Sequence, residues 1–183
     1  KYYILIFLFF LTNESLASIK NDIIKKLNFI ENISFNFEQN INDKIEKGNC
    51  ILQYPKKIFC KYDDFYKKVL VSNGKSLLIN SNKNNQYFRY SLDKTPLNLI
   101  LDKEFIIDRI KELGEEISVG NNYKFELTYE NLDIIIYFDN QSLNLVGWST
   151  IDIYQNKVET KLSIVDKNIQ VDQKIFDIRN YTN

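Results

Sequence analysis

Two pairs of adjacent carboxylates, Asp63-Asp64 and Glu115-Glu116, are the side chains of this sequence best suited to acid–base chemistry. Neighbouring side chains of a strand point to opposite faces, so neither pair is expected to converge on one substrate. The sequence contains no histidine, which removes the usual general base and the commonest metal ligand. It also has no glycine-rich phosphate loop. We therefore interpret the pairs as solvated turn charge and expect no enzymatic activity, metal or cofactor.

The two cysteines, Cys50 and Cys60, allow two interpretations. Strand alternation puts each of them on the apolar face of one of two successive expected strands. The residues that share these faces are Cys50, Leu52 and Tyr54 on the first strand and Ile58, Cys60 and Tyr62 on the second. A hairpin centred on Pro55 places the cysteines opposite each other, and an oxidising compartment would then permit a disulfide. A shifted register prevents it. We favour two unbonded residues on a buried face.

The N-terminus has the pattern of a secretory signal peptide. Lys1 is followed by an apolar run over residues 2–11, and residues 15–17 form a small-x-small site. We expect residues 1–17 to be removed and residues 18–183 to form a single domain. The residue after the site is Ser18, not the cysteine of an acylated bacterial lipoprotein. The formal net charge is zero, so nothing steers the chain towards nucleic acid.

Hydrophobic periodicity predicts a mainly β, α+β chain with two helical interruptions. Apolar residues recur at helical spacing over residues 19–30, and strict alternation begins at Ile33. Strands and turns then follow to about residue 91. Thr95 is expected to cap a helix whose first residue is Pro96. After this helical insert, strands return over residues 123–129, 132–138, 143–155 and 157–165. A large antiparallel sheet that curls strongly would offer its concave apolar face to the helices.

The order of these motifs resembles the LolA family of periplasmic outer-membrane lipoprotein carriers. The resemblance covers most of the chain after residue 18. Its matching segments are residues 33–39, the hairpin positions Gly48, Leu52, Pro55 and Tyr62, the turn over residues 71–75, the Thr-Pro-Leu of residues 95–97, and residues 171–176. Each match alone is weak, but their order and spacing agree with the family and with an exported protein.

The resemblance implies an incomplete antiparallel β-barrel of about 10–11 strands, with helices that close its mouth. It also implies a monomer that shelters acylated lipoproteins without cofactor or covalent chemistry. The partners would be an inner-membrane ATP-driven lipoprotein-releasing complex and an outer-membrane lipoprotein receptor. We expect a cavity wall of Phe35, Phe37, Cys50, Leu52, Tyr54, Ile58, Cys60, Tyr62 and Trp148. We expect a lid formed by Pro96, Leu97, Ile100 and Leu101.

One position departs from the family. The residue before the hairpin proline is usually arginine there, and it is thought to bond the lid and control release. Here it is Tyr54, whose hydroxyl offers one neutral hydrogen bond, worth about 1 kcal/mol net. A charged bond would be stronger.

Three alternatives remain open from the sequence. A receptor of the same fold would need a cysteine at position 18, where Ser18 stands. A periplasmic module for another hydrophobic ligand or for a protein partner would show the same alternation. The apolar strand residues would also fit a closed core without any ligand, because alternation does not separate a filled interior from a cavity.

Overall fold

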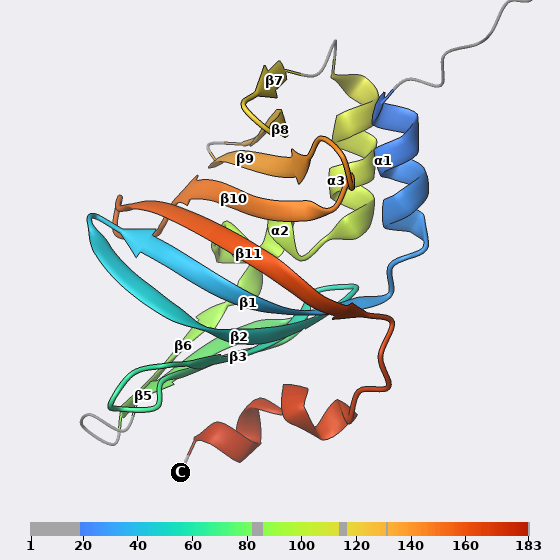
Figure 1. Ribbon diagram of the computed structural model, residues 1–183. Helices are drawn as coiled ribbons and strands as arrows, with labels where there is room; N and C mark the ends of the chain where they lie inside the picture. Colours follow the sequence, from blue (N-terminus) through green and yellow to red (C-terminus); the bar gives the residue numbers. More distant parts are fainter. Residues whose placement is uncertain (1–18, 82–85, 114–116, 131, 183) are drawn as a thin grey trace, which may run out of the picture.

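The structure is a computed structural model that describes residues 19–81, 86–113, 117–130 and 132–182 (Figure 1). The expected signal peptide over residues 1–17 lies outside this part of the chain, and so do Ser18, Glu115 and Glu116. Asp63 and Asp64 are described and lie exposed in a loop. Among the described residues, no helix combines the length and apolar character needed to cross a membrane.

The described residues form strands, α-helices and short 3₁₀ helices. In chain order they are α1 (Ile19–Asn28), β1 (Asn32–Ile41), β2 (Lys44–Gln53), β3 (Lys57–Tyr62), β4 (Val69–Asn73), β5 (Ser76–Ser81), β6 (Gln86–Ser91), η1 (Leu92–Lys94), α2 (Leu97–Ile100), α3 (Lys103–Glu112), β7 (Ile117–Val119), β8 (Asn122–Tyr129), β9 (Leu132–Asp139), β10 (Leu145–Ile151), β11 (Lys157–Lys167), η2 (Gln173–Phe176) and η3 (Ile178–Tyr181).

All strands of the described chain belong to one antiparallel sheet of 11 strands, in the order β6-β5-β4-β3-β2-β1-β11-β10-β9-β8-β7. The long strands β1 and β11 pair at its centre and join the two halves. The edge strands β6 and β7 do not pair with each other, so the sheet curls without closing (Figure 1). The expected strand number and incomplete barrel are therefore confirmed.

The concave face of the sheet carries most of the buried apolar side chains of the strands. On β1 these are Ile33, Phe35 and Phe37, all buried. The amphipathic helix α1 buries Ile23 and Leu27 and lies beside α3 (Figure 1). The helices therefore cover apolar surface that an open sheet would otherwise expose to water.

Gly48 is required where β2 pairs with Phe37 of β1 and Tyr62 of β3. A Cβ atom there would lie 2.1 Å from the carbonyl oxygen of Lys61 and 2.8 Å from a ring atom of Phe37. No side chain fits in that space, because real Cβ atoms do not approach backbone oxygen so closely. The glycine therefore lets the first hairpin lie close to the central strand and keeps the Phe37 ring on the concave face.

The C-terminal helices η2 and η3 cover the convex face of the sheet below β3, β4 and β5 (Figure 1). Ile178 packs there with Val71 and Leu78, and the rings of Phe59 and Tyr181 lie 5.5 Å apart. This small core is separate from the concave face. The convex face of β3, β4 and β5 is thus covered by the C-terminal helices. A ligand site on these strands must therefore lie on their concave face.

Two local expectations differ from the structure. Thr95 does not cap α2 with its side chain; its hydroxyl donates to the carbonyl of Leu92, because η1 ends at that point. The next helix, α3, does have a side-chain cap, because the carboxylate of Asp102 accepts from the amide of Phe105. The strand expected over residues 143–155 is shorter, since β10 ends at Ile151 and a turn follows.

Candidate functional site

An apolar cavity lies between the concave face of the sheet and α2. It has an inner chamber of about 50 Å³ and an outer chamber of about 230 Å³ that opens to solvent. The inner chamber is lined by Phe35, Phe37, Gln39, Cys50, Ile58, Cys60, Tyr62, Leu70, Leu97 and Trp148. Five residues line both chambers: Gln39, Tyr62, Leu70, Leu97 and Trp148. The two chambers are therefore adjacent and share these residues as walls.

The cavity contains most of the wall predicted from the sequence. Aromatic rings set its shape: Phe35 meets Trp148 edge to face at 6.4 Å, and Phe37 meets Tyr62 at 5.0 Å. Strand alternation places these side chains on the concave face. The predicted wall residues that line the inner chamber are Phe35, Phe37, Cys50, Ile58, Cys60, Tyr62 and Trp148.

Two predicted wall residues lie outside both chambers. Leu52 is fully buried in the main core, and Tyr54 lines a different groove. Both lie at the C-terminal end of β2, whereas the cavity follows β2 in the other direction, from Cys50 towards Glu46. Alternation gives the face of a strand correctly here. It does not tell how far along that face the empty space extends, because the helices fill part of it.

The helical insert contributes three of the four predicted lid residues to the cavity. Pro96, Leu97 and Ile100 line the outer chamber, and Leu97 reaches the inner chamber as well. Leu101 does not line either chamber. It follows the last residue of α2 as its C-cap, and its side chain is fully buried in the core. The side chain of Leu101 therefore belongs to the core and not to the cavity.

Cys50 and Cys60 form a disulfide in the cavity wall. The hairpin register pairs Cys50 directly with Cys60, so the preference for two unbonded cysteines was wrong. Both residues are buried, and they line the inner chamber. The bond ties β2 to β3 directly beneath the cavity.

Charged groups stand at the mouth of the outer chamber. The Glu46 carboxylate accepts hydrogen bonds from the ammonium groups of Lys68, at 2.5 Å, and Lys44, at 3.0 Å. Burial alone would raise the pKa of Glu46, but hydrogen bonds from Lys68 and Lys44 outweigh it and lower that pKa. The Lys68 ammonium also lies 3.9 Å from the centre of the Tyr62 ring. Burial, followed by the charges of Glu46 and Asp64, raises the pKa of Tyr62, so the phenol stays neutral.

A pair of tyrosines bridges the two halves of the sheet across the mouth. The hydroxyl of Tyr90 on β6 lies 2.9 Å from the hydroxyl of Tyr154 in the β10–β11 turn. This hydrogen bond and burial raise the pKa of Tyr90 to about 12. Both side chains line the outer chamber. The bond therefore joins edge strand β6 to the far half of the sheet beside the opening.

The connection between hairpin and insert is ionic, although tyrosine replaces the expected arginine. Lys56 pairs with Asp102 at 3.1 Å, and its backbone amide donates to the carbonyl of Leu101. Lys103 donates to the carbonyl of Ile30 and lies 5.7 Å from the centre of the Tyr54 ring. Within the described chain, no hydrogen bond joins the Tyr54 hydroxyl to the insert. Burial, and then the charge of Asp102, raises the pKa of Tyr54.

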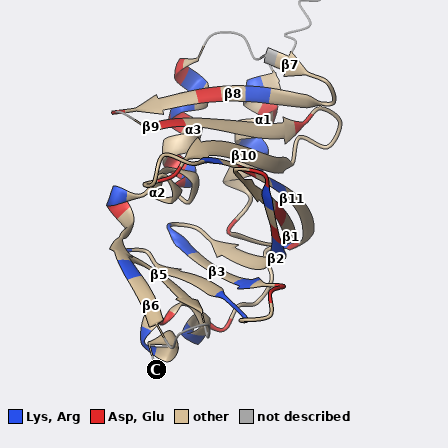
Figure 2. Ribbon diagram, turned by 90° about the vertical axis from the view of Figure 1, so that its left-hand side faces the viewer, with Lys and Arg blue, Asp and Glu red and all other residues tan. Residues whose placement is uncertain are grey.

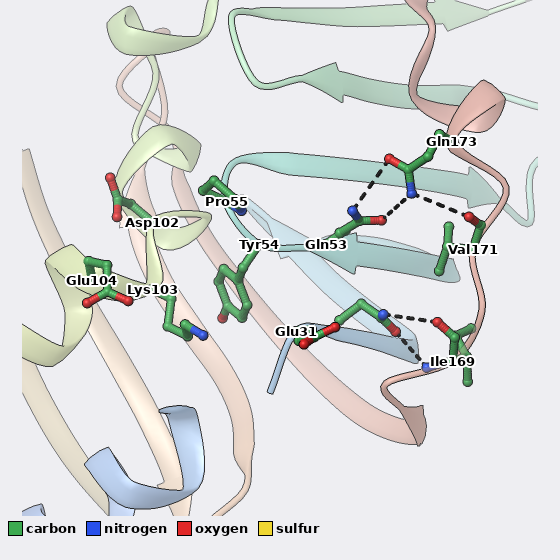
Figure 3. Close-up of a pocket in the computed structure, with 11 residues that line it drawn as sticks. Glu31, Gln53, Tyr54, Pro55, Asp102, Lys103, Glu104, Ile169, Val171 and Gln173 are labelled. Atoms are coloured by element: carbon green, nitrogen blue, oxygen red, sulfur yellow. Dashed lines mark hydrogen bonds between the residues drawn. The ribbon is translucent and has the colours of Figure 1, made fainter. Parts of the chain in front are cut away.

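A second groove, of about 480 Å³, lies between the end of β2, the start of α3 and the segment that follows β11 (Figure 3). It is larger than the apolar cavity, but charged and amide groups such as Glu31, Gln53, Lys103 and Gln173 line much of it. An apolar ligand gains little in such surroundings, because the polar groups would lose water without a partner. The apolar cavity is therefore the better candidate for a ligand site.

Sequence reasoning missed several residues of the outer chamber. Leu70 and Ile79 follow the same alternation as the predicted wall, so the pattern of β4 and β5 contains a signal for them. The turn residues Ile153 and Tyr154 follow no strand period. The missed residues of the outer chamber include Ile41, Leu70, Leu77, Ile79, Tyr90, Ile153, Tyr154 and Val158.

The family model that matches this chain describes a class of carrier proteins. Within that class, this chain belongs to the LolA family. The family model described as "Outer membrane lipoprotein carrier protein LolA" matches residues 28–179. The resemblance drawn from the sequence is thus confirmed. No curated protein matches the chain.

Three solved structures that are similar to the chain share little sequence with it. A DUF1329 family protein from Desulfovibrio piger has a TM-score of 0.50 at 10% identity, with 88% of this chain and 97% of that one covered. A LolA superfamily protein from Nitrosomonas europaea has a TM-score of 0.43 at 10% identity, covering 86% and 96%. A domain described as outer membrane lipoprotein-sorting, from Vibrio parahaemolyticus, has a TM-score of 0.46 at 7% identity, covering 88% and 97%. At such identities the likeness concerns the fold alone.

Proposed function

We propose that this protein is a periplasmic carrier that shelters the acyl chains of lipoproteins between the inner and the outer membrane. The observation that supports it most is the apolar cavity between the concave sheet and α2, with Leu97 reaching both chambers. Membership of the LolA family supports the same role. In this proposal, residues 1–17 direct export, and residues 18–183 act as one monomeric carrier domain.

The size of the hydrophobic effect explains why a carrier is needed. Each methylene withheld from water contributes about 0.8 kcal/mol, so an acyl chain of roughly 15 methylenes corresponds to about 12 kcal/mol. Three such chains correspond to about 36 kcal/mol. A lipoprotein therefore does not leave a membrane at a useful rate unless another apolar surface receives its chains.

The cavity has a size that favours reversible binding. Ligand pockets typically measure roughly 300–1,000 Å³, and the outer chamber, at about 230 Å³, is smaller. Acyl chains would gain room by displacing Pro96, Leu97 and Ile100 from the cavity. The insert would then give up its packing against the wall, which would offset part of the gain from acyl-chain burial. Such a carrier binds its cargo without holding it irreversibly, and the insert acts as a lid.

The proposed partners follow from this role. Cargo would arrive from an inner-membrane ATP-driven lipoprotein-releasing complex and leave to an outer-membrane lipoprotein receptor. The ion pair of Lys56 and Asp102 would hold the lid in place of the arginine that the family usually has at position 54.

A second candidate function is the binding of a single-chain amphiphile. The modest volume of the outer chamber favours it, because one chain needs less displacement of the lid than three. The charged groups of Lys68 and Glu46 at the mouth would then face a polar head group.

Identification of the bound material tests both candidates. The protein should be purified from a periplasm without detergent and its ligand identified by mass spectrometry. Triacylated lipoprotein supports the carrier, and a fatty acid or lysolipid alone supports the second candidate. A clean protein that also fails to take lipoprotein from membranes would contradict both.

A further inference from the structure

Strand β6 leaves one of its two edges without a partner. It is the last strand at one end of the sheet, and among the described strands it pairs with β5 alone (Figure 2). Its ladder with β5 runs from Gln86 to Ser91 without a register shift, and the strand contains no proline. Proteins usually shorten, twist or cover such an edge, because its backbone groups invite another strand. The opposite edge strand, β7, follows that rule with a length of 3 residues.

The unpaired backbone groups at this edge include those of Tyr87 and Arg89. The amide of Leu92 donates to the carbonyl of Lys75, which fixes the phase of the ladder between β5 and β6. Successive residues of an antiparallel strand direct their backbone groups to opposite edges, so the even-numbered residues of β6 are bonded towards β5. The N–H and C=O groups of Tyr87 and Arg89 therefore point away from the sheet. In the described part of the chain, no backbone group bonds to them.

This free edge borders the mouth of the cavity. The side chain of Tyr90 lines the outer chamber, and Phe88 pairs with Ile79, which lines it too. Gln86, at the other end of β6, does not line the chamber. A polypeptide that leaves the cavity past Tyr90 therefore meets the C-terminal end of β6 and can follow the strand towards Gln86. It would then run antiparallel to β6, as neighbouring strands do throughout this sheet.

The cargo of the proposed carrier supplies such a polypeptide. The acyl groups of a bacterial lipoprotein are attached to its N-terminal cysteine, so their burial in the cavity leaves the rest of the chain at the mouth. Because the acyl groups hold one end, the effective concentration of the following segment beside β6 is about millimolar. A few backbone bonds then suffice for pairing. Strand addition uses main-chain groups for affinity, so it requires no particular cargo sequence.

A second copy of this chain fits the edge less well. Antiparallel pairing of two β6 strands about Arg89 places two guanidinium groups directly opposite each other, which is unfavourable. Pairing about Phe88 avoids this repulsion but relies on the backbone groups of Tyr87 and Arg89 alone. An edge of 6 residues buries much less than the roughly 800 Å² per partner of a standard stable interface. The tethered cargo segment needs no such area, because its acyl chains already hold it.

We propose that the polypeptide segment following the acylated cysteine of the cargo adds to β6 as a further antiparallel strand. This inference rests on the proposed carrier function and deepens it. The N–H and C=O groups of Tyr87 and Arg89 bond to the backbone of the segment, while the acyl chains lie in the cavity. The carrier thus holds its cargo at an apolar site and at a main-chain site. The added strand also covers the open edge of the sheet during transit.

Two synthetic ligands separate strand addition from acyl-chain binding. One is a triacylated cysteine amide, and the other has the same cysteine extended by a tail of serine and threonine residues. Arg89→Pro removes an amide that bonds the tail, and proline is tolerated at an edge position whose N–H faces solvent. This variant should bind the tailed ligand about fivefold more weakly than the wild type, the effect of one neutral hydrogen bond. Its affinity for the cysteine amide should not change.

Arg89→Ala is the matched control. It loses the same side chain, with its hydrogen bond to the hydroxyl of Ser76, but keeps the backbone amide. It should therefore bind the tailed ligand as the wild type does. Equal losses for Arg89→Pro and Arg89→Ala would assign the effect to the side chain and overturn strand addition.

Amide hydrogen exchange followed by NMR tests the pairing in the wild-type protein. The tailed ligand should slow exchange at the amides of Tyr87 and Arg89, and the cysteine amide should not. The amides of Phe88 and Tyr90 are bonded to β5 already, so the tail should leave their exchange unchanged. This alternation along β6 is specific to an added strand, because a ligand that merely covered the surface would protect neighbouring amides alike.

The remaining outcomes separate this inference from the carrier function. Equal wild-type affinities for the two ligands, or unchanged exchange at Tyr87 and Arg89, would overturn strand addition and leave the carrier function standing. Binding of neither ligand would refute the carrier function itself. Sedimentation of the ligand-free protein tests the other occupant of the edge. A dimer that Arg89→Pro dissociates and that the tailed ligand does not displace would assign β6 to a second copy and overturn the proposal.

Discussion

The ammonium of Lys56 lies 3.1 Å from the carboxylate of Asp102, and this ion pair joins the β2–β3 hairpin to the start of α3. The amide of the same lysine donates to the carbonyl of Leu101, 2.9 Å away. A charged bond therefore connects the cavity wall to the helical insert, although position 54 has no arginine. Asp102 also caps α3, so one carboxylate serves both the helix and the connection.

Removal of this ion pair should loosen the lid without unfolding the sheet. Half-exposed pairs are worth up to about 1 kcal/mol, so Lys56→Met should change the rate of cargo release by about fivefold at most. Its backbone bond to Leu101 remains. Release can be followed by transfer of labelled lipoprotein to acceptor vesicles. Lys75→Met, an exposed change in the β4–β5 turn, is the control. Equal release rates for both variants would argue against a role of the pair.

A charge on the lid should abolish cargo retention. Leu97 reaches both chambers, so Leu97→Glu would place a carboxylate against the apolar wall and oppose closure and acyl burial. Leu97→Met, which keeps the volume and apolar character, should retain cargo. Circular dichroism and thermal unfolding establish that both variants are folded. If a folded Leu97→Glu protein held as much lipoprotein as the wild type, Leu97 would have no lid role.

Loss of the disulfide should destabilise the cavity wall. Disulfides typically contribute about 2–4 kcal/mol to the free energy of unfolding. The Cys50→Ala, Cys60→Ala double variant should lose about that much and therefore unfold at a lower urea concentration. Urea titrations followed by Trp148 fluorescence measure the difference. Titration of the denatured, unreduced wild type should find no free thiol at these two positions. Two free thiols would contradict the bond directly.

Acid should weaken the mouth through Glu46. Its lowered pKa means that the native carboxylate binds a proton less readily than the unfolded one, whose ordinary value is 4.5. The stabilisation is therefore fully present above that pH and is lost as the pH falls through the lowered native pKa. Glu46→Gln should remove this part of the pH dependence, so the gap in stability between wild type and variant should narrow on acidification. A gap that stays constant from pH 6 to pH 3 would speak against the assignment.

The sequence predicted the strand faces well, because alternation depends only on local geometry. Phe35, Phe37, Ile58 and Tyr62 lie on the concave face as expected. It predicted the extent of the cavity less well, since Leu52 has the same alternation but lies where helices fill the space. That outcome depends on contacts between distant segments, which no local pattern contains.

For a related cause, the sequence left the disulfide open as the less favoured alternative and did not predict the lid contact. Cys50 and Cys60 are opposite in one hairpin register and diagonal in another, and residue types alone do not choose between them. The pairing of Lys56 with Asp102 joins segments that are far apart in the chain. Several other lysines and carboxylates were equally available to a reader of the sequence. Only the packed insert brings these two together.

Site-specific photocrosslinking tests the carrier account most directly. A photoreactive residue should replace Leu70, which lines both chambers, and, as a control, the exposed Val165 on β11. Each variant is then offered a triacylated lipoprotein and the same protein without its acyl chains. We predict a crosslink from position 70 to the acylated form alone, and none from position 165. Failure to crosslink at position 70, or equal crosslinking of both cargo forms, would contradict the burial of acyl chains in this cavity.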